Sequence, residues 1–301
     1  MNATTLDQPV KGRTFQPVSV GRRIKNQLAT SLVTLAFGIA LVPLFWVLYI
    51  VIERGWRAVI TSHWWTNSLK GVSPQSYGGG VYHAIYGTIV QSGIAAVLAI
   101  PLGMMAGVFL VEYGRGPLAR TTTFMVDVLS GVPSIVAALF IFSLWITTIG
   151  FPQSAFAVSL ALVLLMLPVV VRSTEEMLKL VPDELREASY ALGVPKWITI
   201  VRVVVPTALP GIISGILLAI ARVIGETAPV LVLVGYARAI NFDVLDGNMA
   251  SLPLLIYTEL ITNPNPAGQF RMWGAALTLI LLVAFLMVLA ALATRLLTRK
   301  R

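Results

Sequence analysis

Long runs of apolar residues recur along the chain and are separated by short polar segments. A helix of about 18 or more apolar residues can cross the hydrocarbon core of a membrane, which is roughly 30 Å thick. The pattern therefore predicts an all-α, polytopic membrane protein with a polar tail at 1–28 and a transmembrane domain at 29–301. Its six spanning helices are expected at 29–52, 82–111, 124–149, 151–171, 206–236 and 273–294.

Composition and charge agree with membrane insertion and indicate its direction. Of the 301 residues, 57% are hydrophobic and 12% are charged, about half the charged fraction of a soluble domain. With a cytoplasmic N-terminus, the inner segments hold 16 of the 22 Lys and Arg residues and the outer segments hold five. This asymmetry follows the positive-inside rule, so we expect both termini in the cytoplasm. Topology then explains the net charge of +9, and we expect no nucleic-acid partner.

Several kinds of chemistry are excluded by missing residues and motifs. The chain has no cysteine, so it can form no disulfide or thiolate metal site. It also lacks a G-x-x-x-x-G-K-[ST] loop, an HExxH motif and a G-x-S-x-G motif. His63 and His83 stand beside aromatic residues and are expected in an interfacial belt instead of a metal site. We therefore expect no catalytic site, metal or cofactor, and any energy from ATP must come from a partner.

The polar segment 172–205, between the fourth and fifth predicted spans, contains a short helix signal. Acidic residues from Asp183 onward suit the first turn of a helix, and Gly193 ends it after about ten residues. Leu185, Ala188 and Leu192 then share one face. From these residues alone, the segment is either an ordinary surface hairpin or a knob that docks into the groove of a partner.

This segment resembles a signature of the permease subunits of bacterial ABC importers. The residues that carry the resemblance are Glu187, Ala188, Ser189, Gly193, Val203, Val205 and Pro206. In the family, this loop holds a coupling helix that docks onto the ATPase. The resemblance implies that Glu187, Ala188 and Ser189 belong to the docking knob, Gly193 makes the turn, and Pro206 marks the return into the membrane. Ser189 departs from the family pattern, which usually has alanine there.

Other stretches are similar to the permeases of the phosphate-specific importer. They are GGGVYHAIYGT at 78–88, SGVPSIVAALF at 130–140 and ARVIGETAPVLVLVG at 221–235, and they look more like the A-type than the C-type subunit. The resemblance implies a type I importer permease fold in the cytoplasmic membrane and alternating access. It implies four partners besides membrane lipid: a C-type permease, two cytoplasmic ATPase subunits and an extracytoplasmic phosphate-binding protein.

Two charges stand within the fifth predicted span, in the stretch ARVIGETAP. An arginine in the middle of a spanning helix costs about 2.5–3.5 kcal/mol, so Arg222 and Glu226 must avoid lipid. At positions i and i+4 they either neutralise each other and brace the bundle, or line the path of an anion with Thr227 beside them. Arginine matches phosphate oxygens, and a carboxylate can accept a hydrogen bond from a phosphate hydroxyl. Pro229 predicts a kink beside the pair.

Small residues and a third intramembrane charge add further expectations. Gly211, Gly215 and Ala219 fall on the same stripe as Arg222, so another helix or a water-filled path is expected close to it. Asp127, near the start of the third predicted span, is interpreted as a helix-start charge. The GVPS stretch at 131–134 is expected to kink that span.

Three other functions compete with that of a phosphate permease. A permease for another oxyanion or solute would keep the same fold. An ion-coupled secondary transporter or channel would show inverted repeats or further intramembrane charges, and the coupling segment argues instead for an ATPase partner. An intramembrane enzyme is disfavoured because the spans lack a pair of catalytic carboxylates.

Overall fold

The computed structural model describes residues 19–298, which are helical with connecting loops and contain no strand. In chain order the elements are α1 Val20–Val59, α2 Ser62–Thr66, α3 Tyr82–Val108, η1 Phe109–Tyr113, α4 Pro117–Gly131, α5 Ser134–Ile141, η2 Phe142–Thr148, α6 Ala155–Lys179, α7 Asp183–Ala191, α8 Lys196–Thr199, η3 Ile200–Val204, α9 Val205–Ile224, α10 Ala228–Leu233, α11 Leu252–Thr262 and α12 Pro266–Thr298. The η elements are π-helical turns. The all-α prediction is therefore confirmed.

The chain divides into two compact units, one ending at Ile50 and the other beginning at Val51. The described part of the first unit is the N-terminal portion of α1, whose apolar side chains are exposed, as expected for lipid contact. This helix begins at Val20, nine residues before the predicted span, so it includes the basic flank of Arg22, Arg23 and Lys25. The rest of the predicted tail, 1–18, lies outside the described residues.

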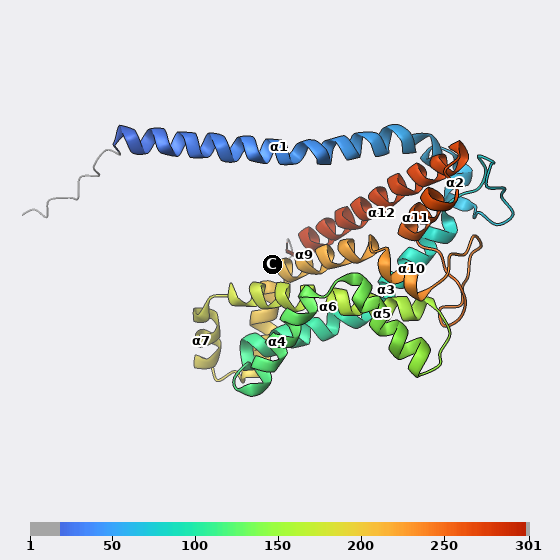
Figure 1. The fold of residues 1–301 in the computed structure, drawn as a ribbon. Coiled ribbons are helices and arrows are strands. Elements are labelled where there is room, and N and C mark those ends of the chain that lie inside the picture. Colours follow the sequence, from blue (N-terminus) through green and yellow to red (C-terminus); the bar gives the residue numbers. More distant parts are fainter. Residues whose placement is uncertain (1–18, 299–301) are drawn as a thin grey trace, which may run out of the picture. The chain divides into compact units, whose positions relative to one another are not determined.

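The second unit is built around α6, which packs against both α3 and α9 (Figure 1). Glycines permit both contacts. A Cβ atom at Gly103 would lie 2.7 Å from a methyl carbon of Val170 on α6, and one at Gly107 would lie 2.7 Å from the Cβ atom of Thr174. Gly211 and Gly215 of α9 meet α6 in the same way. Of the two expectations for the glycine stripe, a closely packed helix is confirmed.

The third predicted span is not a single kinked helix. Its first part, α4, ends at Gly131, and its second part, α5 with η2, leaves at an angle of 107°. Pro133 lies between the parts, where it has no N–H to continue the helix. The described residues thus contain five helices that could each cross a membrane, or six spans if the bent pair counts as one.

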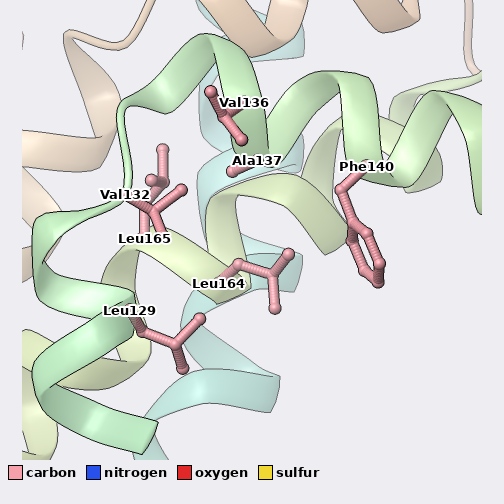
Figure 2. Close-up of a pocket in the computed structure, with 7 residues that line it drawn as sticks. All are labelled: Leu129, Val132, Val136, Ala137, Phe140, Leu164 and Leu165. Carbon is pink, nitrogen blue, oxygen red and sulfur yellow. The ribbon is translucent and has the colours of Figure 1, made fainter.

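An apolar groove lies in the elbow of this bent pair (Figure 2). It has a volume of about 360 Å³, and its walls come from α4, α5 and the facing side of α6. The lining residues are Leu129, Val132, Val136, Ala137, Phe140, Leu164 and Leu165. Since the lining is apolar, the groove is suited to lipid or to another apolar helix and not to an anion.

Several predicted boundaries move once tertiary structure is present. The fourth span begins at Ala155 instead of Phe151, because the Ser154 side chain caps the helix by accepting from the Ala157 N–H. It also continues past 171 to Lys179. The fifth span begins at Lys196, ten residues before Pro206, through α8 and η3. Pro206 occupies the first turn of α9, where its missing N–H is tolerated.

The segment predicted as the outer loop 237–272 contains a helix and a buried ion pair. Its helix is α11, and α12 already begins at Pro266. Arg271 on α12 contacts Glu259 on α11 at 2.9 Å, and each side chain is 1% exposed. The same guanidinium donates to the carbonyls of Pro74 and Ser76 at 2.9 and 2.7 Å. The pair thus ties α11, α12 and the loop before α3 together, and sequence reasoning missed it.

Candidate functional site

The ARVIGETAP stretch forms a break between two helices. α9 ends at Ile224, where the Gly225 N–H bonds back to the carbonyl of Arg222 at 3.3 Å, and α10 begins at Ala228. Pro229 stands in the first turn of α10, where it lacks the N–H that a continuous helix would use. The predicted kink beside the charges is confirmed, and it is a complete interruption of the helix.

This break separates the two charges that sequence spacing placed on one helix face. Arg222 lies in the last turn of α9 and is exposed, whereas Glu226 lies in the break and is half-buried. In the part of the chain that the structure describes, no ion pair joins them. The i, i+4 ion pair is therefore not formed in this conformation, because helical geometry stops before Glu226. Thr227, also half-buried, is the N-cap residue of α10.

Glu226 lines a small polar cavity inside the bundle. The lining residues are Thr88, Gln91, Ser92, Leu162, Val223, Ile224, Glu226, Val230 and Ser251. Thr88, Gln91 and Ser92 come from one face of α3 and are all buried. Sequence reasoning missed these residues, although three polar side chains at i, i+3 and i+4 in an apolar span are a readable signal. These three residues stand at positions 7, 10 and 11 of α3, in its N-terminal half.

The predicted coupling helix is confirmed as a helix. α7 spans Asp183–Ala191 and projects beyond the end of α6 (Figure 1). Gly193 ends it with φ of 75°, a conformation that side chains other than glycine rarely adopt. Leu185, Ala188 and Leu192 are exposed, and Leu192 is 83% exposed. The structure thus presents a short apolar face at this end of the bundle, with Glu187 exposed beside it.

Ser189 lies on a side of α7 that is buried against α8. It is buried, and its hydroxyl lies 2.8 Å from the hydroxyl of Thr199 on α8. The expectation that Ser189 is part of the docking surface must be corrected for this reason. Its hydrogen bond fastens the two arms of the hairpin, which also explains why a polar residue fits where the family pattern has alanine.

A second set of hydrogen bonds joins α7 to the turn that follows α3. Arg186 donates to the Glu112 carboxylate from Nε and Nη2, at 3.1 and 3.0 Å. It also donates to Asp183 and to the carbonyls of Val181 and Leu178 at the end of α6. Together these contacts use all five guanidinium N–H donors. The orientation of the hairpin is therefore fixed by contacts that the sequence motif does not contain.

A chain of ion pairs links α4 to the same end of α6. Arg172 contacts Asp127, and it also contacts Glu175 at 2.7 Å. Glu175 in turn contacts Lys179 at 2.6 Å. Asp127 lies in the eleventh position of α4, so its interpretation as a helix-start charge is wrong. It neutralises a charge on the neighbouring helix instead.

No group of three or more His, Cys, Asp or Glu residues that could hold a metal ion occurs among residues 19–298. His83 is buried, with its Nε2 atom 3.4 Å from the hydroxyl of Tyr236 and the two rings edge to face. Its burial differs from the interfacial position that the sequence predicts.

Helices of this length and apolarity, packed through glycines and broken by a charged segment, are those of a multi-pass membrane protein. The family described as "Binding-protein-dependent transport system inner membrane component" matches residues 99–301. The chain therefore belongs to this family, on the branch of the PstA permeases.

Relatives match the chain along nearly its whole length. It is 68% identical, over 100% of this chain and 97% of the relative, to "Phosphate transport system permease protein PstA 1" of Mycobacterium tuberculosis. It is 71% identical to "Phosphate transport system permease protein PstA" of Mycobacterium leprae, over 94% of this chain and 93% of the relative. It is 39% identical to the protein of the same name in Yersinia pestis, over 89% of this chain and 90% of the relative.

Solved structures support the fold alone, because their sequences are distant. A chain of a bacterial alginate ABC transporter, crystallised with an alginate-bound periplasmic protein, has a TM-score of 0.61 at 14% identity, over 90% of this chain and 95% of that chain. A chain of the inward-facing methionine ABC transporter MetNI has a TM-score of 0.58 at 21% identity, over 72% and 94%. The predicted ABC importer permease fold is confirmed.

Proposed function

We propose that this chain is the subunit through which an ATP-driven importer moves inorganic phosphate into the cytoplasm. The observation that carries the proposal is the 68–71% identity, across nearly the whole chain, to proteins named as phosphate transport permeases. The exposed guanidinium of Arg222 supports it, because a planar fork of N–H donors suits phosphate oxygens. The subunit moves phosphate without catalysis of its own, and ATP is hydrolysed by partners.

In this proposal α7 is the contact with a cytoplasmic ATPase. The exposed residues Leu185, Glu187, Ala188 and Leu192 would enter a groove on that partner, as an amphipathic helix does. Both termini and α7 would then lie in the cytoplasm, in agreement with the positive-inside asymmetry. The full importer would contain a C-type permease, two ATPase subunits and an extracytoplasmic phosphate-binding protein.

The substrate path would pass Arg222, Glu226 and Thr227 at the helix break. Arg222 is exposed on this chain, and an arginine that faces lipid is energetically unfavourable. We therefore place Arg222 against a water-filled path that this chain shares with the second permease. Phosphate at neutral pH keeps at least one hydroxyl, from which a carboxylate such as Glu226 can accept a hydrogen bond, while sulfate keeps none. The site therefore favours phosphate over a fully deprotonated oxyanion.

Uptake into proteoliposomes that hold the complete importer tests the proposal. We expect ATP-dependent accumulation of radiolabelled phosphate and little accumulation of radiolabelled sulfate. The matched control is the same importer with its ATPase inactivated by substitution of the phosphate-binding lysine. Equal uptake of sulfate and phosphate would favour a general oxyanion permease, and phosphate uptake that survives the inactive ATPase would favour an ion-coupled transporter.

A further inference from the structure

A polar face on α3 points into the bundle beside the helix break. Thr88, Gln91 and Ser92 are 3%, 2% and 7% exposed. The Thr88 hydroxyl donates to the carbonyl of Ala84 and accepts from the N–H of Leu252, both at 2.8 Å. The Ser92 hydroxyl donates to the carbonyl of Thr88 at 2.6 Å. Two of the three polar side chains are thus satisfied by the backbone.

Gln91 is the exception. Its amide nitrogen is fully buried and has no hydrogen-bond partner among the described residues. Leaving a buried amide unpaired costs about 1–3 kcal/mol, so such groups are usually satisfied by protein or by an internal water. Gln91 therefore holds an amide donor that no described side chain or backbone group accepts.

The cavity that Gln91 lines has the size and the chemistry of a site for one water. Its volume is about 10 Å³, close to the minimum of about 10–15 Å³ that holds a single water molecule. Among its lining residues are the polar side chains of Gln91, Glu226, Ser92 and Ser251, beside four apolar ones. A water there could accept from Gln91 and donate to Glu226, which meets the two to four polar partners that buried waters have.

We propose that one internal water joins the Gln91 amide to the Glu226 carboxylate and that Gln91 is thereby the positioning residue of Glu226. The link holds the carboxylate on the α3 side of the break. Arg222 is exposed in the last turn of α9 and does not line this cavity, so it keeps its donors for an anion. This consequence rests on the proposed phosphate path, whereas the link itself does not.

The link is tested by the thermal stability of the complete importer in detergent. Gln91→Leu and Glu226→Leu each remove one partner of the link, so each should lower the apparent Tm by about 2–4 °C. The double variant leaves an apolar cavity and should lose less than the sum of the two shifts. Ser214→Leu is the control, because Ser214 is exposed on α9 and bonds within its own helix. Strictly additive shifts would overturn the link.

Transport by the same variants tests the positioning role. Gln91→Leu frees Glu226 to neutralise Arg222, so we expect the KM for phosphate to rise about tenfold with a smaller change in the maximal rate. Gln91→Asn, which keeps a carboxamide, should restore most of the lost affinity. An unchanged KM in Gln91→Leu would overturn the positioning role. If Arg222→Gln also leaves uptake unchanged, the phosphate path itself is wrong, and the additivity of the Tm shifts still decides the link.

Discussion

Arg186 on α7 donates two hydrogen bonds, at 3.0 and 3.1 Å, to one carboxylate oxygen of Glu112 in the turn that follows α3. The side chains are 13% and 5% exposed, so this is a largely buried pair. It connects the proposed ATPase contact to the helix whose other half lines the Glu226 cavity. Motion of the hairpin can therefore reach the helix break through α3 as well as through α9.

Arg186→Gln should loosen the hairpin because it leaves the buried Glu112 carboxylate unpaired. Removing one partner of a buried pair costs about 3–5 kcal/mol, and we expect the variant to insert in the membrane but retain less ATPase on co-purification. Arg202→Gln is the matched control, since Arg202 is exposed on η3 of the same segment. Equal ATPase recovery from both variants would contradict the anchoring role of Arg186.

Ala188→Glu should block docking because it places a charge on the apolar face of α7. Gly193→Val should disrupt the turn, because valine rarely adopts the positive φ of 75° that residue 193 has. Both variants are expected to lose ATPase-coupled phosphate uptake while keeping normal membrane abundance. Tyr190→Glu, two residues from Ala188 and on the opposite side of the helix, is the control. Survival of uptake and of ATPase co-purification in both test variants would show that α7 is not the coupling helix.

Gly107→Leu should disrupt the contact of α3 with α6. A side chain there would enter the space of Thr174, and overpacking of this kind costs about 1–3 kcal/mol. Gly93 lies on the same helix, and a Cβ atom there would face open space with no contact within 4 Å among the described residues, so Gly93→Leu should be tolerated. The measurement is the apparent Tm of each detergent-purified importer. A loss in Gly93→Leu as large as that in Gly107→Leu would argue against close packing on α6.

The membrane spans and α7 could be predicted from the sequence because each is determined by residues close together in the chain. Apolar runs and a glycine stop depend on neighbouring residues, and these do not change when the chain folds. The same reasoning failed at Glu226, since a helix continued through the motif places it one turn from Arg222. The break at Gly225 depends on Pro229 and on the packing of α10, and that packing is seen only in the folded chain.

Contacts between distant segments could not be predicted from one sequence. Arg186 and Glu112 lie 74 residues apart, and Arg271 reaches a carbonyl 195 residues away at Ser76. Nothing in the spacing of these residues indicates their partners. Gln91 is different, because a polar residue in an apolar span is a signal by itself, and weighing every such residue would have found it.

Labelling of introduced cysteines should report the topology, since the chain has no cysteine of its own. Ser73 and Leu192 lie in segments assigned to opposite sides of the membrane, and both are exposed. In intact cells an impermeant thiol reagent should label Ser73→Cys and not Leu192→Cys. Leu192 is a better inner probe than the buried Ser189. The reverse labelling pattern would contradict cytoplasmic placement of α7 and of the termini.

Uptake in the Arg222→Gln, Glu226→Gln double variant, at verified membrane abundance, decides whether Arg222 offers its charge to phosphate. If the two residues only brace the bundle, two neutral amides can bond each other and transport should return. If Arg222 binds phosphate, we expect normal assembly and ATPase binding, with phosphate uptake reduced about tenfold or more, because neutral amides are weaker partners for an anion. Uptake near the wild-type rate would contradict phosphate binding by Arg222.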